Sequence, residues 1–177
     1  MSSNSTVFRS MHDLGLAAWF GGSLMGAIGL NGATAQAEDP QERTRHSSLG
    51  WARWTPAQIA AVGTHAVGGL ALIADNRRRL AVDPGTMLNT KVKLVLTLAA
   101  AGVTLYSGVL GAKVKAMQDE GAEGATEPAP DADPKLASAQ KQLKSLQWAI
   151  PALTGALVVL GAQQGEQQRD ARGLLDK

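Results

Sequence analysis

The stretch from Leu14 to Ala37, LGLAAWFGGSLMGAIGLNGATAQA, contains no Asp, Glu, Lys or Arg. Three later stretches share this property, namely Thr55 to Ala74, Leu94 to Ala112 and Ser145 to Gly165. Each is roughly 19 to 24 residues long, and a helix needs about 20 residues to cross the hydrocarbon core of a bilayer. With nearly all charge placed between them, these stretches predict an all-α integral membrane four-helix bundle, forming a single transmembrane domain over residues 1–177.

The average composition hides this segregation. The mean hydropathy is −0.05 and the formal net charge is +2, because the charged residues are concentrated between the apolar stretches. A soluble Ala-rich bundle is the alternative, but its surface helices would carry a charged face on every turn. The chain has no cysteine, which excludes disulfides, thiolate metal sites and cysteine nucleophiles.

The expected helices follow the charge-free stretches and their flanks. Their expected bounds are about 9–33, 55–75, 91–117 and 136–165. Thr55 can cap the second helix, Pro56 suits its first turn, and Trp51 and Trp54 lie where aromatic side chains anchor a helix at the membrane interface. The segment from about 119 to 134 is rich in Gly, Ala, Glu, Asp and Pro, and we expect a flexible linker there.

The first stretch has a second interpretation. Arg9 precedes an apolar run, and Ala35-Gln36-Ala37 resembles the cleavage site of a secretory signal. This apolar run is longer than the core of a secretory signal, which has about 7–15 apolar residues. Both interpretations stay open, and cleavage would leave three membrane-spanning segments.

The orientation is predicted from Lys and Arg in the short connections. The run Arg77-Arg78-Arg79, with Lys91 and Lys93, makes the second connection strongly positive. Because positive connections stay in the cytoplasm, we expect both termini there and a multi-pass location in the cell membrane. The arginine run is interpreted as a topology signal or as a site for anionic lipid headgroups.

Two stripes of small residues are expected to pack inside the bundle, because close backbone approach drives helix association in lipid. The first stripe follows helical spacing on one face and consists of Gly15, Trp19, Gly22, Gly26, Gly29 and Ala33. The second consists of Thr97, Ala101, Thr104, Gly108 and Gly111. Gly22 and Gly26 also form a G-x-x-x-G pair.

His65 is the candidate cofactor-binding residue. It lies near the middle of the expected second helix, where polar side chains are costly and face the bundle interior or a ligand. It could bind haem or a metal, or relay protons. The alternative is a neutral histidine hydrogen-bonded inside the bundle, to Thr97 or Thr104.

A haem held between His12 and His65 is disfavoured by depth. His12 is placed at the membrane edge and His65 about ten residues inside its helix, a mismatch of roughly 12–18 Å at about 1.5 Å per residue. Helix tilt does not remove so large a difference. His46 is expected to be a solvated loop residue.

The motifs of common enzymes are missing from the sequence. It has no P-loop, no H-E-x-x-H and no G-x-S-x-G. The charge-free stretches provide no carboxylate pair for ion transport, and the scattered basic residues do not indicate nucleic-acid binding. We therefore expect no catalytic residues, and a protein that is not an enzyme.

One short motif carries a family resemblance. The run from His12 to Gly22, in which a histidine precedes Trp19-Phe-Gly-Gly, is similar to the first helix of CopD-like membrane proteins. That resemblance implies copper handling through histidines and methionines, although Met25, Met87 and Met117 form no cluster with a histidine in the sequence. The whole chain resembles small multi-spanning membrane proteins of high-GC actinobacteria.

Two functions remain from the sequence. The first is a non-enzymatic accessory or scaffold subunit of a larger membrane assembly, with the lipid bilayer and that assembly as partners. The second is a haem-binding, metal-binding or solute-transporting membrane protein that uses His65, with the cofactor unknown.

Overall fold

The computed structural model describes residues 3–173, with the side chains of residues 5–78 and 80–165. Within that range, every regular element is a helix. The four long helices are α1 (Ser3–Met25), α3 (Pro40–Asp75), α5 (Pro84–Ala116) and α6 (Pro134–Gly173). The short ones are the π-helix η1 (Gly26–Leu30), α2 (Asn31–Thr34), α4 (Arg77–Val82) and the 3₁₀-helix η2 (Gln118–Glu120).

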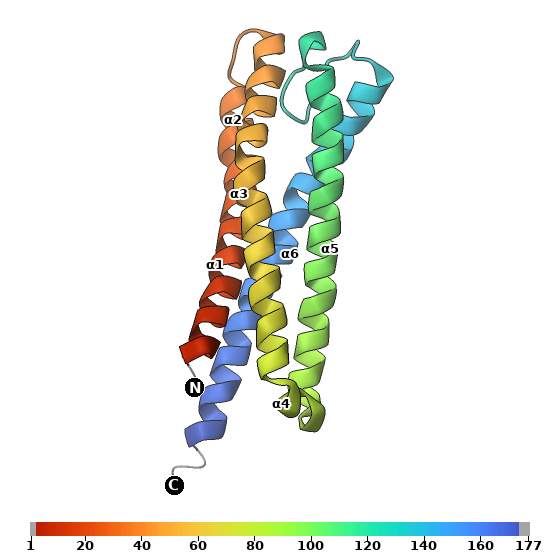
Figure 1. The fold of residues 1–177 in the computed structure, drawn as a ribbon. Coiled ribbons are helices and arrows are strands. Elements are labelled where there is room, and N and C mark those ends of the chain that lie inside the picture. Colours follow the sequence, from red (N-terminus) through yellow and green to blue (C-terminus); the bar gives the residue numbers. More distant parts are fainter. Residues whose placement is uncertain (1–2, 174–177) are drawn as a thin grey trace.

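The long helices form an elongated bundle, which confirms the predicted all-α four-helix fold. α1 lies beside α3 along most of its length, while α6 crosses the bundle between α5 and α1 (Figure 1). The N-terminus, α4 and the end of α6 share the lower end, which we call the α4 end (Figure 1). Each long helix is apolar enough to cross a membrane. Outward side chains such as Leu105, 73% exposed, and Ile59, 67% exposed, would face lipid.

Three of the long helices begin at an Asp-Pro pair. Asp39 accepts a hydrogen bond from the backbone N–H of Gln41 at 2.7 Å, and Asp83 accepts one from Gly85 at 3.0 Å. Asp133 does the same for Lys135 at 2.7 Å. An acidic N-cap followed by proline at the first helical position is a strong start signal, because proline lacks an N–H that would need a partner.

These caps correct several expected bounds. α3 begins at Pro40 rather than at Thr55, so Pro56 lies inside the helix and Thr55 donates to the carbonyl of Trp51. His46 is therefore an exposed helical residue rather than a loop residue. α5 begins at Pro84 rather than near residue 91, and α6 extends from Pro134 to Gly173 rather than from 136 to 165.

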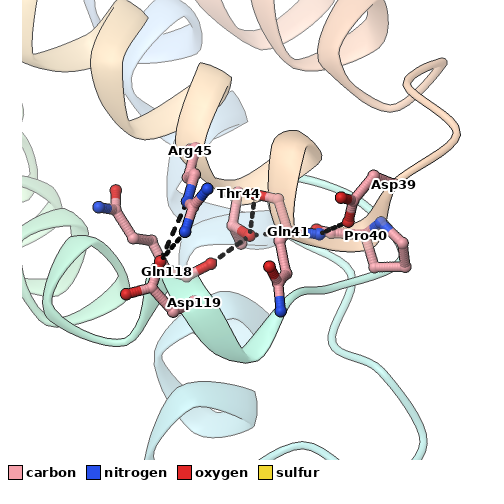
Figure 2. A network of polar contacts seen from close by, with 7 residues as sticks. All are labelled: Asp39, Pro40, Gln41, Thr44, Arg45, Gln118 and Asp119. Carbon is pink, nitrogen blue, oxygen red and sulfur yellow. Dashed lines mark hydrogen bonds and ion pairs between the residues drawn. The ribbon is translucent and has the colours of Figure 1, made fainter.

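η2 and the connection that follows it pack against the start of α3. Thr44 is fully buried and donates to the carbonyl of Gln118 at 2.9 Å, and Arg45 pairs with Asp119 at 2.6 Å (Figure 2). The backbone N–H of Ala122 donates to the carbonyl of Pro40 at 3.1 Å. The flexibility expected for residues 119–134 stays a prediction, but the connection follows a defined path with a fully buried Ala122.

The core has two centres. The first joins all four long helices and contains Trp19, Ala61, Ala100 and Ile150. The second lies between α5 and α6 and contains Leu110, Val114, Leu136 and Ala139. In the C-terminal half of α5, the residues that contact α6 are therefore Leu110 and Val114, and not the predicted small-residue stripe. Gly108, expected inside, is exposed, and no atom beyond its own helix backbone lies within 4 Å of a Cβ built there.

Gly22 of α1 and Gly26 of η1 accommodate aromatic rings of α3. The indole of Trp54 covers Gly22, and that of Trp51 covers Gly26, each in contact with the space a Cβ would occupy. The two tryptophans expected as interfacial anchors thus pack between helices. Gly29 meets only the Met25 side chain of its own helix turn. The π-helical turn η1, between residues 26 and 30, changes which residues after it point into the bundle. A stripe drawn with one uniform helical period does not predict this change.

Just after this π-turn, Asn31 links three helices. Its side chain is 9% exposed, accepts from the indole N–H of Trp51 at 2.9 Å and donates to Gln147 at 2.8 Å. Both partners come from other long helices, α3 and α6. The sequence interpretation did not single out Asn31, although a polar residue inside a charge-free stretch is a usable signal for such a network.

We expect Asn31→Leu to destabilise the bundle by about 1–3 kcal/mol, because it leaves the half-buried Trp51 N–H and Gln147 side-chain carbonyl without these partners. Denaturant titration in detergent would measure this. Gln36→Leu, at an exposed position, is the control and should have little effect. The double variant Asn31→Leu/Gln147→Leu should lose less than the two single losses added together. Full additivity would contradict the network.

Candidate functional site: a cavity beside two paired histidines

The site is built where α1 and α3 approach most closely. A Cβ built at Gly15 would lie 2.5 Å from the backbone nitrogen of His65. Likewise, a Cβ at Gly68 would lie 2.5 Å from the backbone nitrogen of His12. Each helix therefore supplies one glycine against the other's histidine backbone, and side chains larger than hydrogen do not fit at either position.

This approach brings the two histidines together. The ring centroids of His12 and His65 are 4.2 Å apart, with the rings inclined by 38°. The expected depth mismatch of roughly 12–18 Å, from about 1.5 Å per residue, is wrong. It counted depth from Thr55, whereas α3 begins at Pro40 and α1 runs beside it, so that His12 lies opposite Gly68.

His65 is satisfied by the bundle itself. Its side chain is buried, Nδ1 lies 3.0 Å from the carbonyl oxygen of His12, and Nε2 lies 3.4 Å from the Thr97 hydroxyl. Since a carbonyl only accepts, Nδ1 donates and carries the proton, and Nε2 accepts from Thr97. This is the neutral, hydrogen-bonded histidine that the sequence analysis left as the alternative for His65.

The residues do not fit a haem or a metal ion. Two histidines that ligate one haem iron lie on opposite faces of the porphyrin, whereas these rings are in contact at 4.2 Å. Ligation by His65 would also break one of its two hydrogen bonds. Among the described residues, no group of three or more His, Cys, Asp or Glu could hold a metal ion. The copper role implied by the CopD-like resemblance therefore has no matching donor set there.

A cavity of about 580 Å³ opens beside the histidine pair. Its walls come from α1, α3, α5 and α6, and it reaches the α4 end through Asn76, Leu80 and Thr86. The volume lies within the about 300–1,000 Å³ range of small-molecule sites. His12 lines this cavity with a side chain that is 17% exposed, held by a 2.9 Å contact between Nδ1 and Asp13.

Two basic side chains line the cavity near the α4 end. They are Arg9 of α1 and Lys93 of α5, and Lys93 donates a hydrogen bond to Gln164 of α6. Among the side chains that the structure describes, neither cation forms an ion pair with a carboxylate. Asp13 is the one carboxylate in the described lining, so the cations outnumber it by two to one.

The remaining wall is mostly apolar. It includes Leu16, Leu70, Ile73, Leu94, Leu98 and Leu157. Along α5 the lining changes from Thr86 and Thr90 through Lys93 to Leu98, in order of distance from the α4 end. Arg9 and Lys93 therefore lie nearer the α4 end of the cavity than Leu98, while the polar Thr97 and His65 lie beside Leu98 in its deeper part.

The other predicted site residues have separate positions. Thr104 accepts a hydrogen bond from the Trp19 indole at 3.1 Å and does not line the cavity. Arg77 and Arg78 are exposed at the start of α4, and the side chain of Arg79 lies outside the described residues. Arg9 and Lys93 were not assigned to a site from the sequence, because both lie outside the charge-free stretches, in the first turns of the expected helices 9–33 and 91–117.

The fold and cavity define an all-α, multi-pass membrane protein with a solute-sized cavity at one end of its bundle. No protein-family model, curated protein or solved structure matches the chain.

Proposed function

We propose that this is a non-enzymatic integral membrane protein that binds a small molecule in the cavity beside His12 and His65. The supporting observation is the 580 Å³ cavity between the long helices, whose lining combines an apolar wall with a smaller number of polar and charged groups. That combination is characteristic of small-molecule sites.

His65 has a structural role in this proposal. It joins α1 to α5 through the His12 carbonyl and Thr97, and so forms part of the wall. Of the three ligands considered from the sequence for the second function, which were haem, a metal ion and a solute, we therefore propose the solute. The accessory-subunit role stays a prediction, because no feature of the described residues identifies a protein partner.

A cavity-filling substitution tests the proposal. Ala66 lines the cavity, whereas Ala60, on the same helix and also exposed, does not. With the neutral fluorescent probe 1-aminoanthracene and protein in detergent, we expect saturable binding to the wild type. Ala66→Trp should weaken this binding about tenfold or more, since the indole occupies the site, and Ala60→Trp should leave it unchanged. Equal binding to the two tryptophan variants would reject the cavity as the site.

A further inference from the structure

The charges and walls of the cavity define the class of molecule it takes. We infer that the cavity binds an anionic amphiphile with a single apolar chain, its acidic head between Arg9 and Lys93 and its chain toward the bundle centre. This inference rests on the proposed function and specifies its ligand.

The anionic head follows from the lining. Lys93 is half-buried and held in place by Gln164, so its ammonium group is positioned at the cavity wall. Arg9 lines the same cavity from α1. Two cations sharing a partly desolvated space repel each other, and a carboxylate or phosphate between them would relieve that repulsion and accept charge-assisted hydrogen bonds.

The carboxylate of Asp13 does not replace such a ligand. It is 63% exposed and is engaged by Nδ1 of His12 at 2.9 Å. A cationic or neutral ligand would leave the two basic groups without an added partner. The lining charge therefore selects for acids.

The single chain follows from the size and the apolar wall. A cavity of about 580 Å³ is too small for a two-chain phospholipid. Part of its apolar lining, Leu98 and Leu157, lies toward the bundle centre beyond Lys93. An amphiphile entering at the α4 end would therefore keep its head at the membrane surface and bury its chain between the helices.

Displacement of 1-aminoanthracene distinguishes the head groups. Oleate, oleyl phosphate and oleyl alcohol share one chain and differ in the head. At equal detergent concentration, we expect at least one of the two acids to displace the probe at about tenfold lower concentration than the alcohol. Comparing oleate with oleyl phosphate then assigns the head as carboxylate or phosphate.

Charge-removing variants test the two cations. Lys93→Gln and Arg9→Gln should each reduce the advantage of the acid to within about threefold, because one charge partner is lost. Lys91→Gln is the matched control, since Lys91 is exposed on the same helix and does not line the cavity. Thermal melting shows whether each variant is folded. If Lys93→Gln is not folded, the comparison of Arg9→Gln with Lys91→Gln decides whether the preference for acids depends on a cation of the cavity.

The outcomes separate the two proposals. If the probe binds in the Ala66 cavity but oleyl alcohol competes as well as the acids, or no amphiphile competes, the ligand class is wrong and the cavity site stands. If Lys91→Gln removes the acid preference as fully as Lys93→Gln, the assigned head position is wrong. If the probe shows no cavity binding, the proposed function fails and this inference fails with it.

Discussion

Replacing Trp19 with alanine is expected to cost about 3–5 kcal/mol of folding free energy, the usual range for removing a buried aromatic side chain. Trp19 has no exposed surface and contacts the centre where the four long helices meet. Its indole N–H donates to the hydroxyl of Thr104 at 3.1 Å. The substitution removes the largest of the fully buried side chains. The cavity that remains is bordered by residues of several helices, and these helices cannot all move inward to fill it.

Two further variants provide a control and separate the loss of the aromatic ring from the loss of the indole N–H. Trp148→Ala removes an indole that is 50% exposed and should change stability much less, in reversible unfolding by denaturing detergent. Trp19→Phe keeps an aromatic ring and removes the N–H, so it should cost less than the alanine variant. Equal losses for Trp19→Ala and Trp148→Ala would show that this core is not where the bundle gains its stability.

The sequence predicted the fold because charge is excluded from helices that meet lipid. The four charge-free stretches correspond to the four long helices. The helix starts were predicted less well, although Asp39-Pro40, Asp83-Pro84 and Asp133-Pro134 each form a start signal. Charge alone predicts helices that are too short, because a helix can continue beyond its apolar stretch when polar residues pack on a neighbour, as Thr44 does.

The candidate site was predicted only in part, for geometric reasons. His65 was expected in the bundle interior, either as a cofactor ligand or hydrogen-bonded to Thr97 or Thr104, and the observed bond joins it to Thr97. The pairing of His12 with His65 depends on the relative height of two helices, which hydropathy does not determine. The positions of Arg9 and Lys93 depend on the same register. A sequence pattern gives the face of a helix, whereas the register comes from contacts such as those at Gly15 and Gly68.

Gly68→Ala should therefore have a large effect for so small a change. The added Cβ would lie 2.5 Å from the His12 nitrogen and 2.7 Å from the Phe8 carbonyl oxygen, so the two backbones must separate. We expect a loss of about 1–3 kcal/mol or more from this overpacking, together with weaker probe binding in the adjoining cavity. Gly63→Ala on the same helix meets nothing within 4 Å, and should keep or slightly raise the melting temperature because alanine favours the helix.

Gly15→Ala applies the same strain from the other helix, since its Cβ would meet the His65 nitrogen at 2.5 Å. Once either substitution has separated α1 from α3, the second finds the space already opened. The loss in Gly15→Ala/Gly68→Ala should thus be smaller than the sum of the single losses. Gly15→Ala/Gly63→Ala should be additive, because Gly63 faces away from α1. Additive losses in the first pair would mean that the two glycines act separately, and that the histidine contact does not depend on a single shared helix approach.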